Sequence, residues 1–176
     1  MMTTDLRYPI GRFARPASFT DASRSAVISA IDELPAKLRH ATHRLSDAQL
    51  DTPYRPGGWT VRQVVHHLAD SHLNAYVRTR LALTEENPTI KPYDEAKWAE
   101  LADARSMPTE PSLSMLDAIH ARWVALLKTL TSEHFPRLLM HPENGPMSID
   151  SLLELYAWHG RHHVAQVTSL RTSEGW

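Results

Sequence analysis

The sequence of 176 residues contains no cysteine, and this absence excludes several kinds of site at once. Without thiols the chain cannot form a disulfide, a cysteine-based zinc finger, an iron–sulfur cluster or a cysteine nucleophile. Any metal that it binds must be held by nitrogen and oxygen ligands. The lack of cysteine also fits a reducing compartment, so we expect a cytoplasmic protein.

The sequence also lacks a large excess of charge of either sign and any long apolar run. Nineteen basic and twenty acidic residues give a formal net charge of -1, which argues against a general attraction to nucleic acid or to an anionic membrane. No stretch approaches the roughly eighteen consecutive apolar residues of a membrane span, and the N-terminus lacks the apolar region of a signal peptide. We therefore expect a soluble protein that binds neither nucleic acid nor membranes.

The length and the apolar content predict one domain. A chain of 176 residues with 42% hydrophobic residues can form a single sizeable core. Residues 1–17 show little periodicity and include two prolines and a glycine, so we expect an extended N-terminal arm there. Residues 18–176 are expected to form the domain itself.

Apolar residues recur at helical spacing in four long segments, whereas no segment of comparable length alternates like a strand. The second segment has the clearest start, because Thr60 and Gln63 form a capping box. The predicted helices run from Ser18 or Thr20 through Leu38, from Val61 to about Glu86, from about Ser112 to Leu130, and from the cap Ser148 to the C-terminus.

Prolines punctuate this pattern in two places. Pro35 lies within the first segment and is expected to kink or split that helix. Four prolines between residues 88 and 111 surround a short helical stretch near residues 94–104 and mark a crossover connection. The sequence therefore predicts an all-α fold, a four-helix bundle with a long crossover, which often builds metal sites between its helices.

Six of the eleven histidines fall within two predicted helices, in VVHHLADSH at 64–72 and WHGRHH at 158–163. His159 and His163 are four residues apart, so both imidazoles can reach one metal ion from one helix face. A turn of about 100° per residue places both beside the apolar stripe, pointing inward. By the same count Gln166 can orient a ligand, and His162 lies further towards solvent.

A tetrahedral site needs a third ligand, which the first stretch can supply from His66, His67 or His72. Periodicity leaves the choice open, because His72 lies nearest the middle of the apolar stripe and His67 on its flank. An isolated pair of histidines is weak evidence, since such residues are usually structural. Two histidine-rich stretches on different helices of a cysteine-free chain nevertheless favour a metal site.

The residues between the paired histidines limit the chemistry. No glutamate follows His159, so this is not the H-E-x-x-H motif of zinc proteases. Three neutral imidazoles leave a coordination position open, where a divalent ion lowers the pKa of water towards about 7 or stabilises a thiolate. Near these stretches, Trp59 is expected to be a hydrophobic staple and Asp70 a surface residue.

Two longer segments contain both histidine stretches: GWTVRQVVHHLADSHLNAYVRTRLALTEENPTIKPYDEAKW and YAWHGRHHVAQVTSL. They resemble the YfiT-like branch of the DinB superfamily. The resemblance extends from YPIG near the N-terminus, through LDTPYRPGGWT, to the final Trp176, and so covers essentially the whole chain. It implies a DinB-like four-helix bundle with one divalent metal ion per subunit, Zn2+ first and Ni2+ as the alternative, in a cytoplasmic homodimer.

The resemblance also implies the metal ligands and the activity. The ligands of the family pattern are the second histidine of the HH pair, here His67, and the two histidines of H-x-x-x-H, here His159 and His163. The implied function is that of a metal-dependent hydrolase with a small-molecule substrate, in which Asp70, Gln166 or another group would handle protons.

Two alternatives to hydrolysis stay open. Some relatives are S-transferases that join a low-molecular-weight thiol, bacillithiol, to an electrophile, a reaction that needs no protein general base. A metal-binding or ligand-sensing protein without turnover is the other alternative. No catalytic residue beyond the metal ligands is predicted.

Overall fold

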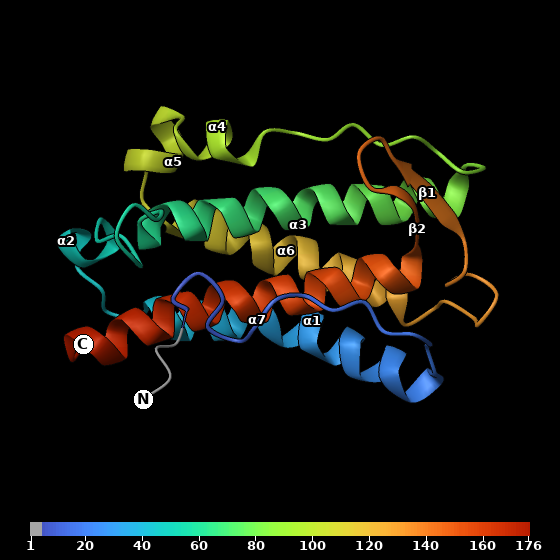
Figure 1. Ribbon diagram of the computed structural model, residues 1–176, viewed down its shortest axis with the longest axis horizontal. Coiled ribbons are helices and arrows are strands. Elements are labelled where there is room, and N and C mark those ends of the chain that lie inside the picture. Colours follow the sequence, from blue (N-terminus) through green and yellow to red (C-terminus); the bar gives the residue numbers. More distant parts are fainter. Residues whose placement is uncertain (1–4) are drawn as a thin grey trace.

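The computed structural model describes residues 5–176, and its four long helices lie side by side (Figure 1). Helix α1 contacts α7 and α6, and α3 contacts the same two helices, so the four form a closed bundle. The predicted four-helix bundle is therefore confirmed. The long helices are α1 (Asp21–Thr42), α3 (Val61–Thr84), α6 (Glu110–Leu127) and α7 (Ile149–Glu174).

The connections contain short elements, some of which the sequence did not reveal. The crossover from α3 to α6 carries α4 (Glu95–Ala99) and α5 (Ala102–Ser106) and passes over the outer side of α3 in Figure 1. Helix α2 (Asp47–Leu50) and an antiparallel hairpin of β1 (Leu138–His141) and β2 (Gly145–Ser148) were not predicted. Four residues are too few for an alternating pattern to stand out.

Side-chain caps determine where the helices begin. Thr20 caps α1 and Thr60 caps α3, each in a capping box with the residue three positions later. Ser148 accepts a hydrogen bond from the backbone of Ser151 at the start of α7. Helix α6 begins at Glu110, two residues earlier than predicted, because Pro111 is compatible with the first turn of a helix.

Pro35 does not split α1, and that part of the prediction is wrong. The helix continues from Asp21 to Thr42 with Pro35 buried inside it. Because proline has no N–H, the carbonyl of Ile31 loses its partner within the helix. The side chain of His120 in α6 replaces that donor, with its Nδ1 2.6 Å from the oxygen of Ile31. A neighbouring helix thus satisfies the carbonyl that Pro35 leaves open.

The N-terminal segment, residues 5–20, contains neither helix nor strand and lies along α7 (Figure 1). Arg15 donates two hydrogen bonds to Ser151 Oγ at 2.9 and 2.6 Å. The ring of Phe13 lies 5.8 Å from that of Trp158. The first four residues of the predicted arm lie outside the described residues. Within residues 5–176, no helix combines the length and apolar character needed to cross a membrane.

Gly160 allows α7 to pack closely on α1. A Cβ atom added at Gly160 would lie 2.6 Å from Cδ2 of the buried Leu34. In an unhindered helix, alanine is more stable than glycine by about 1 kcal/mol. Here the overlap must displace Leu34, so we expect Gly160→Ala to lower the free energy of unfolding by about 1–3 kcal/mol.

Urea denaturation of Gly160→Ala, Leu34→Ala and the double variant checks this expectation. Because Leu34→Ala removes the overlapping atoms, the double variant should lose less stability than the sum of the two single losses. A Gly160→Ala protein more stable than the parent would contradict the steric argument.

Candidate metal centre

Three histidines from two helices meet inside the bundle: His67 of α3, and His159 and His163 of α7. One imidazole nitrogen of each lies within 4.8 Å of the others. The Nε2 atoms of His67 and His159 are 3.1 Å apart, and nitrogens bound to one tetrahedral zinc ion are roughly 3.3 Å apart. The donor atoms and their spacing therefore fit a divalent metal ion.

Burial keeps these three imidazoles neutral. His67 and His163 are each 7% exposed, and His159 is half-buried. Burial lowers the pKa of His67 to about 4, and burial together with neighbouring imidazoles holds the pKa of His159 and His163 well below the usual value. A neutral imidazole has one nitrogen without a proton, so each residue can offer a lone pair to a metal ion at pH 7.

Gln166 fixes the orientation of His163. Its amide nitrogen donates to the backbone oxygen of Arg7 at 3.2 Å and lies 3.0 Å from His162 Nε2. Its oxygen accepts from His163 Nδ1 at 2.8 Å. The proton of His163 is therefore on Nδ1, and Nε2 is available for the metal. Gln166 therefore orients His163, as its spacing along the helix predicted.

His162 is buried, and the prediction that it lies towards solvent is wrong. Its side chain is 6% exposed, and its ring stacks on Trp158 with 4.6 Å between centroids. The ring of Tyr8 packs against the ring of His162 at a tilt, with 5.8 Å between centroids. The helical count considered α7 alone and could not foresee that the N-terminal segment covers this side. His162 is not part of the three-histidine cluster.

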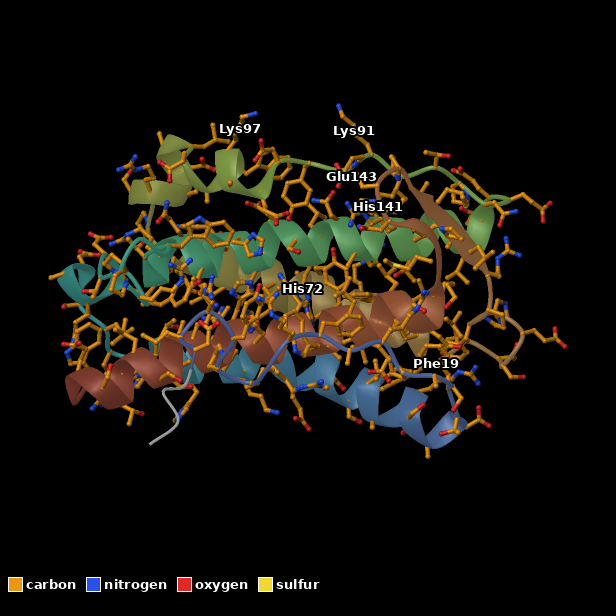
Figure 2. The ribbon with its side chains drawn as sticks, in the orientation of Figure 1. Phe19, His72, Lys91, Lys97, His141 and Glu143 are labelled. Carbon is orange, nitrogen blue, oxygen red and sulfur yellow. The ribbon has the colours of Figure 1, made fainter. Side chains whose placement is uncertain are left out.

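The two other candidates of the first histidine stretch, His66 and His72, are not members of the cluster. His66 faces another way, with Nδ1 2.7 Å from Ser112 Oγ and Nε2 3.2 Å from the backbone oxygen of Met107. His72 is fully buried and lies between α3 and α7 (Figure 2). Its Nε2 is 3.4 Å from Nδ1 of His159, the nitrogen that does not face His67.

A cavity of about 350 Å³ opens beside the cluster, with His163 on its wall. The N-terminal segment, the loop before α3 and α7 line it. Trp59, predicted as a hydrophobic staple, also lines this cavity and packs on His67 with 4.7 Å between centroids. None of the lining residues in the described part of the chain is an aspartate or a glutamate.

Two arginines line the same cavity, in different surroundings. Arg7 pairs with Asp5 at 3.1 Å. Arg55 instead donates to uncharged oxygens, with Nε 3.2 Å from Tyr54 Oη and Nη1 3.0 Å from the backbone oxygen of Pro56. The charge of Arg55 is therefore available to an anionic ligand.

Asp70, predicted as a surface residue, is only partly exposed, and it does not line this cavity. It is half-buried on α3, where burial raises the pKa of its carboxyl to about 6 and the charge of Asp103 on α5 adds to the shift. Asp70 therefore lies near the crossover, and it is not among the residues that line the cavity beside the histidines.

Comparison with known proteins agrees with the fold and the site. Residues 30–167 match the family model of the DinB superfamily. A Bacillus cereus (strain B4264) protein named "Putative metal-dependent hydrolase" is 54% identical over 172 residues, which are 98% of this chain and 99% of the relative. A Bacillus mycoides (strain KBAB4) protein of the same name is 52% identical over the same shares of the two chains.

Two solved structures are similar to this chain. YfiT from Bacillus subtilis, described as "a probable metal-dependent hydrolase with an unusual four-helix bundle topology", superposes with a TM-score of 0.95 and 48% identity over 98% of this chain and 99% of YfiT. The four-helix bundle protein TT2238 has a TM-score of 0.55 and 18% identity over 87% of this chain and 99% of its own, and shows the fold alone. The chain therefore belongs to the DinB superfamily and, within it, to the YfiT-like metal-dependent hydrolases, whose activity together with the histidine cluster implies a bound metal ion.

Proposed function

We propose that the protein hydrolyses a small anionic substrate with one Zn2+ ion held by His67, His159 and His163. The observation that carries this proposal is the set of three neutral imidazoles within 4.8 Å of one another, beside a cavity. Three imidazoles suit zinc and leave its fourth tetrahedral position open. When bound, the ion would act as a Lewis acid that lowers the pKa of water and polarises the substrate.

The residues of the cavity would bind the substrate and limit the access of water. Arg55 supports an anionic substrate, because within residues 5–176 its side chain donates only to a hydroxyl oxygen and a carbonyl oxygen. Trp59 covers one face of His67. Gln166 holds the proton of His163 away from the side that would face the ion.

An S-transferase reaction is the second candidate, in which a low-molecular-weight thiol such as bacillithiol attacks an electrophile. The observation in its favour is the lack of an aspartate or glutamate among the described residues that line the cavity. Hydrolysis gains from a general base, whereas a thiolate is already a nucleophile. Because the chain has no cysteine, the thiol would have to come from the substrate.

One set of assays separates the two reactions. Zinc-loaded protein is given esters and amides with and without a carboxylate, and separately bacillithiol with a fluorogenic electrophile. We expect hydrolysis without added thiol and a KM for anionic substrates that rises roughly tenfold or more in Arg55→Gln, while the KM for neutral substrates stays unchanged. Turnover only with thiol would replace hydrolysis by transfer, and no turnover with either would favour a sensor.

The metal and the oligomeric state are part of this proposal and have separate tests. Metal analysis of protein purified without added metal should find about one zinc ion per chain, whereas nickel in its place would overturn the choice of zinc. The homodimer rests on the family resemblance. Light scattering should give about twice the chain mass of 19.9 kDa, and the mass of one chain would contradict it.

A further inference from the structure

A row of three histidines crosses the bundle, starting at His159 of the three-histidine cluster. Nδ1 of His159 lies 3.4 Å from Nε2 of His72, and Nδ1 of His72 lies 3.0 Å from Nε2 of His120. Nδ1 of His120 in turn lies 2.6 Å from the backbone oxygen of Ile31. These residues come from α7, α3, α6 and α1, so the row links all four long helices.

The hydrogen bond between His120 and the carbonyl of Ile31 determines which nitrogen of each histidine in the row carries the proton. A carbonyl oxygen can only accept, so Nδ1 of His120 carries a proton and donates to Ile31. Both His72 and His120 are fully buried, which disfavours the charged form of an imidazole, so each ring carries one proton. Nε2 of His120 therefore accepts from Nδ1 of His72. Nε2 of His72 accepts from Nδ1 of His159, which leaves Nε2 of His159 without a proton, facing His67.

Pro35 explains why the carbonyl at the end of the row is available. In an ordinary helix, the N–H of the residue four positions later would donate to the oxygen of Ile31. Pro35 stands at that position and has no N–H. The carbonyl is therefore directed to His120, and the proton of His120 is fixed by a backbone atom.

We infer that His72 and His120 are positioning residues that hold His159 in the tautomer whose Nε2 can bind the metal. The inference rests on the proposed metal centre. Residues that accept the second N–H of a metal-binding histidine orient the ring, and their loss typically weakens metal binding about 10- to 100-fold. The acceptor here is a neutral imidazole, not a carboxylate, so the row adds no negative charge near an anionic substrate.

Zinc affinity, measured by competition with a chelator, tests the role of His72. His72→Phe fills the space without accepting a proton, and should bind zinc about 10- to 100-fold more weakly. His72→Gln can both accept and donate, and should restore most of the affinity. His66→Phe is the matched control, because it removes a buried histidine of the same helix whose two hydrogen bonds do not reach the cluster. Unchanged zinc affinity in His72→Phe would overturn the inference.

A double variant tests whether His120 acts through His72. Replacing His120 with phenylalanine should also weaken zinc binding, because His72 loses the acceptor that fixes its own tautomer. Once His72 is absent, the loss of His120 should cost no further affinity. Two independent losses that add in the double variant would contradict a connected row.

The tautomers themselves can be observed in the metal-free parent protein by nitrogen NMR of the imidazole rings. This measurement remains decisive if the phenylalanine variants do not fold. His72, His120 and His159 should each carry the proton on Nδ1, and a proton on Nε2 of any of them would overturn the inference. A parent protein with these tautomers that binds no metal would instead refute the proposed function alone.

Discussion

His67→Ala is expected to remove the metal from the protein, whereas His66→Ala should leave it bound. The two residues are neighbours on α3 and equally buried, at 6% exposed for His66 and 7% for His67. Only His67 contributes to the three-histidine cluster. The loss of a ligand should weaken zinc binding by more than the roughly 10- to 100-fold that the loss of an orienting residue causes. Hydrolysis should disappear with the metal.

Two measurements check this pair of variants. Metal analysis after dialysis should find zinc in the parent and in His66→Ala, and almost none in His67→Ala. A ligand that binds only the folded state stabilises it, by about 2.7 kcal/mol at a free concentration of about 100 times Kd. Zinc should therefore raise the melting temperature of the parent and of His66→Ala. Tight zinc binding by His67→Ala would exclude the proposed centre.

The helices could be predicted from the sequence because local signals specify them. The capping box of Thr60 and Gln63 starts α3 at the predicted residue, and Ser148 caps α7 as expected. The prediction that Pro35 splits the first helix is wrong, because His120 of another helix supplies the hydrogen-bond donor that the proline lacks. Local propensity contains no information about His120, which lies 89 residues from Ile31 in the sequence.

The site could be predicted only in part, for a similar reason. Spacing along α7 identified His159 and His163 as a pair, and the structure brings them together with His67. Periodicity could not decide between His67 and His72, because both lie inside the bundle and differ only in which side of His159 they approach. That choice depends on how α3 and α7 are placed relative to each other, and it came from the family pattern.

The row of histidines was out of reach for single-helix arguments. In the sequence, His120 stands at helical spacing from Leu116 and Trp123, and no neighbouring residue indicates a partner for it. Its role follows from the contact of α6 with α1 and α3. The one signal in the sequence is Pro35: a proline within a helix leaves a carbonyl without its donor, and when that carbonyl is buried another polar group must supply the donor.

Trp123 packs against this row of histidines, and we expect its removal to destabilise the protein strongly. This residue is fully buried, and its ring centroid lies 5.8 Å from that of His120 and 6.2 Å from that of His72. Trp123→Ala would leave a cavity that the packed helices cannot close. We expect the free energy of unfolding to fall by about 3–5 kcal/mol, a large share of the roughly 5–15 kcal/mol that stabilises a typical domain.

Denaturation of the metal-free protein with urea checks this value without a contribution from zinc binding. Trp98→Ala is the matched control, because Trp98 is 39% exposed on α4 and packs on Tyr93 at 4.4 Å between centroids. Trp98→Ala should lower the free energy of unfolding by less than about 1.5 kcal/mol. Trp123→Ala should also weaken zinc binding, because the space it opens lets His72 turn away from His159. A variant destabilised by 3 kcal/mol or more with unchanged zinc affinity would show that Trp123 only fills the core and that the row holds its geometry through its hydrogen bonds alone.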